Sequence, residues 1–179
     1  MQYGFGVDIG GTTIKIGLFS VDGDLMEKWE IPTNKTDNGK YILTEIADFI
    51  NRTIETKGIE KSDVMGVGLG VPGPVNKNGF VSVCVNLGWN SLNVEKEFHQ
   101  ISGLKVKVGN DANVAALGEM WQGAGKGYQD VLMVTLGTGV GGGCVLNGQI
   151  VSGIHGAGGE IGHMPVRDDE KTPCNCGNH

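Results

Sequence analysis

The 179-residue sequence lacks an excess of basic side chains, a long apolar run and a secretion signal. Its 14 lysines and arginines against 20 aspartates and glutamates give a formal net charge of −6. This balance offers no basic surface for nucleic acid and disfavours adhesion to an anionic membrane. No apolar segment approaches the roughly 20 residues of a membrane-spanning helix, and no basic segment followed by an apolar one opens the chain. We therefore expect a cytoplasmic α/β protein with no nucleic-acid or membrane partner.

Cysteine is also scarce, with four in the chain. Cys84 and Cys144 each stand alone in an apolar, strand-like segment, where a buried free thiol is expected. Cys174 and Cys176 form a close pair near the end of the sequence. In a protein of this composition, such a pair suggests metal ligands or thiols more than a disulfide.

Glycine, in contrast, is abundant, and the 32 glycines cluster at particular turns instead of spreading as in a linker. One such turn joins the strand-like segments 3–7 and 14–19. Without Cβ atoms at two of its positions, backbone N–H groups and threonine hydroxyls can approach phosphate oxygens. Asp8 could hold a hydrated magnesium ion, and Lys15 could pair with phosphate or face solvent. An ordinary hairpin turn explains the glycines alone equally well. The nucleotide-binding residues predicted for this turn are Asp8, Gly10, Gly11, Thr12, Thr13 and Lys15.

A second glycine-rich turn joins the strand-like segments 131–136 and 140–146. Its Gly-x-Gly-x-x-Gly spacing resembles a dinucleotide fingerprint, but that fingerprint must open a helix. Here the glycines lead into a strand. Two strand–turn–strand loops, one in each half of the chain, would instead grip a triphosphate from both sides. The second loop contributes Gly137, Thr138 and Gly139 to the predicted nucleotide site.

Apolar periodicity predicts the remaining elements. Apolar residues recur every three or four positions from 41 to 57, which predicts a helix that Gly58 ends. Between 64 and 71, glycine alternates with valine and leucine, which predicts a central strand with one bare face and something packed closely on it. Further strands are predicted at 3–7, 13–20, 24–31 and 104–108, and further helices at 94–101 and 112–121.

Five more motifs lie at 68–75, 86–89, 109–119, 159–163 and 174–177. Together with the two turns, they resemble the ROK family (repressors, open reading frames and kinases) of the actin-like superfamily, most closely its bacterial glucokinases. The resemblance implies an α/β, actin-like ATPase (ribonuclease H-like) fold, with a mixed sheet flanked by helices. It also implies transfer of the ATP γ-phosphoryl group to the 6-hydroxyl of a hexose, most readily glucose, with magnesium, in a protein that commonly forms homodimers.

Asp111 is the predicted general base. A sugar hydroxyl is a poor nucleophile, so a positioned carboxylate should accept its proton as the bond to phosphorus forms. Asp111 begins a predicted helix, where backbone N–H groups and the helix dipole favour the ionised carboxylate. From local sequence alone, a helix cap is the plainer interpretation of this residue. The resemblance makes Asp111 the base and Asn110 a sugar ligand, and capping and catalysis can coexist.

The resemblance also assigns Glu160 and His163 to contacts with sugar hydroxyls, which carboxylate and imidazole recognise through directional hydrogen bonds. Without the surrounding motif, both would be interpreted as solvated loop side chains. Gly73 is expected to offer a close backbone approach, and Asn86 a hydroxyl partner. The predicted sugar-binding residues are Gly73, Asn86, Asn110, Asp111, Glu160 and His163.

A structural zinc ion is predicted at His163, Cys174 and Cys176. A closed structural site normally has four ligands, and the fourth is open here. The family's motif continues with a further cysteine and a sugar-binding glutamate, whereas this sequence ends at His179. We therefore expect an N-terminal portion of a kinase, with a first domain (1–122), followed by a boundary at 123–127, and the start of a second domain (123–179). We expect this polypeptide alone to bind ATP poorly and to turn over negligibly.

Several alternatives stay open at this level. The sugar could be an N-acetylhexosamine, fructose or mannose, and the phosphoryl donor could be polyphosphate. A sugar-sensing regulator of the same family would need a DNA-reading module, for which the first strand, beginning at Tyr3, leaves no room upstream. A filament-forming actin-like ATPase would need neither the sugar motif at Asn110 and Asp111 nor the cysteine pair.

Overall fold

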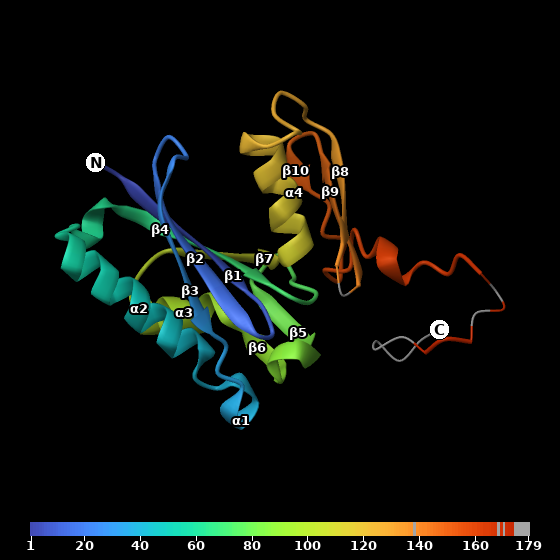
Figure 1. Ribbon diagram of the computed structural model, residues 1–179, viewed down its shortest axis with the longest axis horizontal. Coiled ribbons are helices and arrows are strands. Elements are labelled where there is room, and N and C mark those ends of the chain that lie inside the picture. The colour runs from blue at the N-terminus through green and yellow to red at the C-terminus, as the bar shows by residue number, and fades with distance from the viewer. Residues whose placement is uncertain (138, 168, 170, 174–179) are drawn as a thin grey trace.

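The computed structural model describes residues 1–137, 139–167, 169 and 171–173. Its largest element is a five-stranded sheet in the order β3-β2-β1-β4-β7 (Figure 1). The first three strands form an antiparallel meander, and β4 and β7 run parallel to β1, so the sheet is mixed. The strands are β1 (Tyr3–Ile9), β2 (Thr13–Ser20), β3 (Leu25–Pro32), β4 (Val64–Val71) and β7 (Val106–Asn110).

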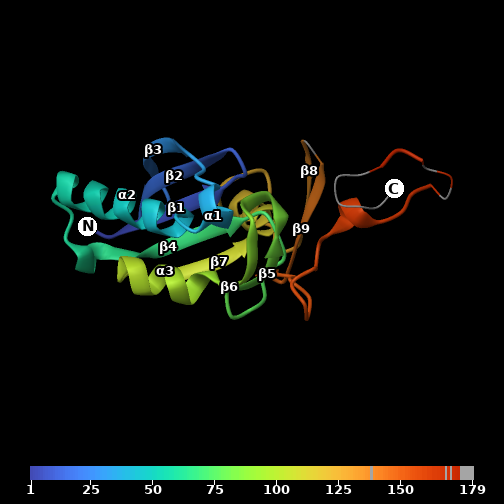
Figure 2. The same cartoon turned by 90° about the horizontal axis from the view of Figure 1, so that it is seen from below.

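Two helices cover one face of this sheet, α2 (Ile42–Lys57) and α3 (Val94–Ser102), and Figure 2 shows them side by side. Alternate residues of β1 and β2 point to this face and form a buried core with the apolar side of α2. Gly58 ends α2 in the left-handed conformation, with φ 62°. The helices predicted at 41–57 and 94–101 are thus confirmed.

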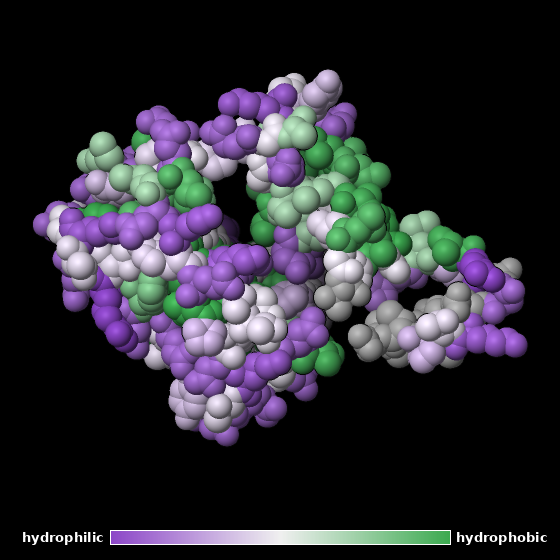
Figure 3. Space-filling model, viewed as in Figure 1, coloured by the Kyte–Doolittle hydropathy of each residue, from purple (hydrophilic) through white to green (hydrophobic). Residues whose placement is uncertain are grey.

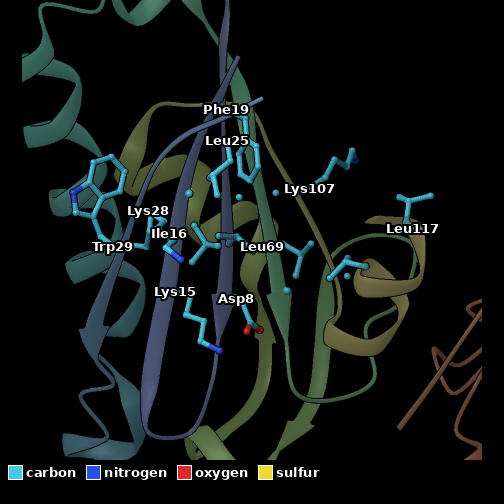
Figure 4. Close-up of a pocket in the computed structure, with 18 of the residues that line it drawn as sticks. Asp8, Lys15, Ile16, Phe19, Leu25, Lys28, Trp29, Leu69, Lys107 and Leu117 are labelled. Atoms are coloured by element: carbon cyan, nitrogen blue, oxygen red, sulfur yellow. The ribbon is translucent and has the colours of Figure 1, made fainter. Parts of the chain in front are cut away.

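The opposite face of the sheet is rich in glycine. Gly6, Gly17 and Gly68 lie in register across β2, β1 and β4. The ring of Phe19 lies over these glycines: a Cβ on Gly17 would be only 2.7 Å from the Phe19 ring. A groove of about 860 Å³ results, with Phe19 and Leu25 at one end and Asp8 at the other (Figure 4). The bare face predicted for residues 64–71 is therefore present. The close packing predicted on it is found at Gly70, where a Cβ would lie 3.0 Å from Val114, but not at Gly68, where a Cβ would meet only the Phe5 carbonyl oxygen at 4.0 Å.

A two-stranded hairpin was not predicted from the sequence. It comprises β5 (Phe80–Cys84) and β6 (Trp89–Asn93), joined by the 3₁₀ turn η2 (Val85–Leu87). Gly88 and Ser91 both have positive φ values, 77° and 55°, and these interruptions hide the two-residue periodicity of strands. The other short helical turns are α1 (Thr36–Gly39), η1 (Lys61–Asp63) and η3 (Ile161–His163).

A second, smaller sheet has the order β10-β9-β8 and is antiparallel. Its strands are β8 (Val131–Leu136), β9 (Val140–Leu146) and β10 (Gln149–Ile150). The β8–β9 hairpin confirms that the second glycine-rich turn joins two strands. Helix α4 (Asp111–Gln122) connects the two sheets and packs mainly on the second one (Figure 1). The domain boundary at 123–127 stays a prediction.

Glycine explains how α4 comes so close to β9. A Cβ on Gly143 would overlap the carbonyl oxygen of Ala112 and lie 2.7 Å from the Cβ of Ala116. The helix backbone therefore rests directly on the strand. In the described part of the chain, no helix is both long and apolar enough to cross a bilayer.

Candidate active site

A cavity of about 1150 Å³ lies where the two sheets meet. Its walls come from the end of β1, the junction of β7 and α4, the β8–β9 turn and the loop around η3. Segments far apart in the sequence therefore line one space. The predicted site residues on its walls are Asp8, Gly73, Asn86, Asn110, Asp111, Gly137, Gly139, Glu160 and His163.

Asn110 is the cap of helix α4. Its Oδ1 accepts a hydrogen bond from the Asn113 backbone N–H at 3.1 Å, and its Nδ2 donates to the Gly73 carbonyl oxygen at 3.2 Å. The capping interpretation therefore holds for Asn110, whereas Asp111 is the first residue of the helix proper. Asn110 also ties the Gly73 loop to the helix that carries Asp111.

Burial raises the pKa of the Asp111 carboxyl, and the nearby carboxylate of Asp8 raises it further. The Ala112 backbone N–H donates to Asp111 Oδ1 at 2.8 Å and opposes this shift, but it does not outweigh burial. The expected effect of the helix start is thus present in the Ala112 hydrogen bond, but loss of solvation outweighs it and the pKa is raised overall. A carboxylate with a raised pKa binds a proton more readily, which suits a general base.

Cys84 is hydrogen-bonded to the loop that contains Gly73. Its thiol is buried and donates to the Pro72 carbonyl oxygen at 2.8 Å. Burial raises the pKa of this thiol, and Asp111 contributes to the same direction. The prediction of a buried free thiol is confirmed for Cys84, whereas Cys144 is free but only half-buried.

The first glycine-rich turn borders the cavity only through Asp8. Gly10 and Thr13 close the turn by a 3.0 Å backbone hydrogen bond and line neither the cavity nor the glycine groove. Lys15 pairs in register with Asp8 on the neighbouring strand and lines the groove (Figure 4). Lys15 therefore lies outside the cavity that contains Asp111.

Gly11 and Thr12, at the tip of this turn, border a separate polar pocket of about 480 Å³ with Lys35 and Asn86. Asn86 lines both this pocket and the main cavity. A Cβ on Gly11 would lie 3.6 Å from the Cβ of Asn86. The first glycine-rich turn and Asn86, a predicted sugar ligand, are therefore in contact.

Glu160 and His163 lie in a glycine-rich loop that packs directly on β9. A Cβ on Gly162 would overlap the Val140 carbonyl oxygen, and one on Gly142 would overlap the Gly159 carbonyl oxygen. His163 Nε2 lies 3.7 Å from Glu160 Oε2. The two side chains thus form a polar pair on the wall of the cavity.

The comparisons with known proteins show the family of this chain. A model of the ROK family matches residues 4–179. The chain belongs to the ROK family. A glucokinase of Halalkalibacterium halodurans is 49% identical over 173 residues, which cover 96% of this chain and 52% of that protein. An N-acetyl-D-glucosamine kinase of Haemophilus influenzae is 36% identical over 185 residues, covering 97% of this chain and 59% of that protein.

Among solved structures, a ROK family glucokinase from Streptomyces griseus in complex with glucose and AMPPNP has a TM-score of 0.76 and 35% identity. The match covers 93% of this chain and 52% of that one. These neighbours confirm the actin-like ATPase fold. The chain spans about half the length of the curated relatives it matches.

Three predicted site residues of this ROK chain, Thr138, Cys174 and Cys176, lie outside the described residues. The predicted zinc site therefore keeps only His163 within them. The described ranges hold no group of three or more His, Cys, Asp or Glu side chains placed to bind a metal. Asp8 and Asp111 do line one cavity, and carboxylate oxygens are the donors that magnesium prefers.

Sequence reasoning missed three residues that shape the site of this ROK chain. Pro72 offers the acceptor for Cys84, and Lys35 borders the pocket beside the first turn. Asn113 lies buried on α4 next to the loop that carries Glu160. Pro72 and Asn113 both belong to recognised motifs, at 68–75 and 109–119. Asn113 was missed because a polar residue in the first turn of a helix is ordinarily expected to face solvent.

Proposed function

We propose that the protein to which this ROK chain belongs transfers the γ-phosphoryl group of ATP to a hexose hydroxyl, with glucose as the favoured sugar. One observation carries the proposal. Asp111, whose pKa is raised, shares a cavity with Asp8, with the second glycine turn and with the Glu160–His163 pair. A proton acceptor, phosphate-binding backbone and hydroxyl ligands are the groups that sugar phosphorylation needs. The relative named a glucokinase supports glucose.

Asp111 would accept the proton of the sugar hydroxyl as the bond to phosphorus forms. Asn86, Glu160 and His163 would hold the other hydroxyls, and the backbone at Gly73 would approach the ring. Asn110 would fix the Gly73 loop against the base through its 3.2 Å bond. Because phosphoryl transfer depends mainly on positioning and charge stabilisation, these contacts would provide most of the rate enhancement.

The second turn is well suited to phosphate. A Cβ on Gly137 or Gly139 would meet no other atom within 4 Å, so packing within the described chain does not require glycine at either position. Both positions leave the backbone open to close approach by a ligand. Asp8 would hold magnesium, which neutralises charge on the phosphate oxygens when it is bound. The nucleotide site we propose comprises Asp8, Gly137 and Gly139 on the cavity wall, together with Thr138. It also includes the first-turn residues Gly10, Gly11, Thr12, Thr13 and Lys15, although these do not line the cavity that contains Asp111.

Further features of the whole protein belong to the same proposal. Imidazole and thiolate are typical zinc ligands, so His163, Cys174 and Cys176 would hold a structural zinc ion. The acidic composition supports a cytoplasmic protein without nucleic-acid or membrane partners. We also propose that the whole protein forms a homodimer, and that this chain comprises a first domain, 1–122, and part of a second, 123–179. Because the relatives are about twice as long, we expect negligible turnover from these 179 residues alone.

A coupled phosphorylation assay tests the function on the gene product at its full length. The panel offers glucose, mannose, fructose and N-acetylated hexosamines, each with ATP or polyphosphate. Glucose with ATP should give the highest kcat/KM, and Asp111→Asn should lower kcat by about 10²-fold or more. The proposal fails if no hexose is phosphorylated, or if Asp111→Asn keeps the wild-type rate.

An N-acetylhexosamine kinase is the second candidate, and the relative named an N-acetyl-D-glucosamine kinase supports it. The same panel separates the two sugars by their kcat/KM values. A filament-forming ATPase would instead hydrolyse ATP at the same rate with and without hexose. A sugar-sensing regulator would bind hexose without phosphorylating it.

A further inference from the structure

Asn113 is a buried polar residue to which neither the family resemblance nor the proposed mechanism gives a role. It lies in the first turn of α4, two residues after Asp111, and is 3% exposed. Its Nδ2 points at the Gly158 carbonyl oxygen, 3.5 Å away. Its side chain therefore reaches from the helix of the proposed base to the loop that precedes Glu160.

The other end of this amide has no partner. Asn113 Oδ1 is buried and accepts no hydrogen bond. It faces Gly159, since a Cβ there would lie 3.4 Å from it. A buried acceptor without a partner lowers stability, and an apolar side chain of similar size would avoid that cost. Fold stability alone therefore does not account for an asparagine at this position.

The surroundings of Asn113 make the contact between helix and loop unusually direct. Gly159 has φ 88°, and a Cβ on it would lie 2.8 Å from the Gly142 carbonyl oxygen. The loop before Glu160 therefore packs between β9 and the first turn of α4. A small displacement of this loop would move Glu160, the next residue, along the wall of the cavity that contains Asp111.

We propose that Asn113 is a positioning residue that sets the Glu160 loop at a fixed place relative to Asp111, and so sharpens the recognition of sugar hydroxyls. This inference rests on the proposed hexose kinase function. Discrimination between sugars depends on hydrogen-bonding groups held at the correct distance. The amide supplies that distance by touching Gly158 and Gly159 while its own backbone is held by the Asn110 cap.

The test uses Asn113→Leu and Asn113→Ala in the full-length gene product. Leucine keeps the branched shape, removes the unpartnered oxygen and also removes the weak donor to Gly158, so we expect an unfolding temperature close to that of the wild type. Both variants should raise the hexose KM about tenfold or more, because misplaced binding groups lose much of their effect. The KM for ATP should change less than about twofold, and discrimination against deoxy analogues of the sugar should narrow.

Ser102→Ala is the matched control. Ser102 is also buried and hydrogen-bonded, to Phe98 and Leu104, but it lies on α3, outside the cavity. It should lower the unfolding temperature and leave the hexose KM unchanged.

Calorimetric titration of hexose separates the possible failures. If the wild type binds hexose and Asn113→Leu binds it equally well, the inference is overturned while the proposed function stands. If the wild type binds no hexose, both are overturned. A hexose KM that rises in Ser102→Ala as much as in the Asn113 variants also overturns the inference, because general loosening of the fold then explains the effect.

Discussion

Asp111 is subject to two opposing demands. Burial raises the pKa of its carboxyl, which makes the carboxylate a stronger proton acceptor but also makes its ionised form costly to keep in the fold. Below its ordinary value of 3.8 the group is protonated in both folded and unfolded chains, and no cost arises. As the pH rises through the raised pKa, the folded state loses stability relative to the unfolded one. The proposed catalytic power therefore comes at the expense of stability.

Asp111→Asn should stabilise the protein at pH 7 while lowering kcat by about 10²-fold or more. Asparagine keeps an acceptor for the Ala112 N–H and removes the buried charge. Thermal unfolding measured from pH 4 to pH 8 should show the variant above the wild type at neutral pH, by about 2–4 °C for each kcal/mol gained. The difference should shrink toward pH 4. A variant that melts below the wild type at pH 7 contradicts this account.

The same pKa shift should appear in the kinetics. Because only the ionised carboxylate can accept the hydroxyl proton, kcat/KM for the hexose should fall as the pH falls through the raised pKa. The midpoint of that acidic limb should lie above 3.8, the ordinary value for aspartate. A midpoint at or below that value would contradict the conclusion that burial dominates the pKa of Asp111.

Among the elements, the contact between α4 and β9 depends most on glycine. Gly143→Ala should lower stability by about 1–3 kcal/mol, because the new methyl group would overlap the backbone of Ala112. Gly118→Ala in the same helix is the control. Gly118 is exposed and a Cβ there meets nothing within 4 Å, so alanine should raise stability by about 0.5–1 kcal/mol through helix propensity. Urea unfolding of both variants measures the two effects, and equal changes would contradict the close packing.

The elements also show how far sequence reasoning reaches. The two glycine-rich hairpins, α2 and the strand β4 follow from local periodicity and turn chemistry, and the structure has them at the predicted places. The β5–β6 hairpin does not, since positive φ values at Gly88 and Ser91 interrupt its pattern. The order of the motifs predicts that Asp111, Glu160 and Asn86 belong to one site, and all three line one cavity. It does not show that Asn113 meets Gly158, nor that burial outweighs the helix start at Asp111, because both depend on contacts between segments remote in sequence.

On the scale of the whole molecule, the two sheets differ in how much of their surface is covered. The first sheet has helices on one face and a core that continues into the hairpin. On the second sheet, alternate residues of β8 face outward, Leu132, Val134 and Leu136, each at least half exposed. Figure 3 shows apolar side chains gathered over this region. Exposed apolar patches of this kind favour association.

The 179-residue polypeptide should therefore self-associate as its concentration rises, and Val134→Lys should weaken that association. Val83→Lys is the matched control, because Val83 is 49% exposed against 50% for Val134 and lies on β5, away from the second sheet. Both substitutions change the net charge equally, so a difference between them reports the β8 face and not charge repulsion. Sedimentation velocity over a concentration series measures the effect. If both variants dissociate equally, or if the wild type stays monomeric throughout, the exposed face of β8 does not mediate self-association.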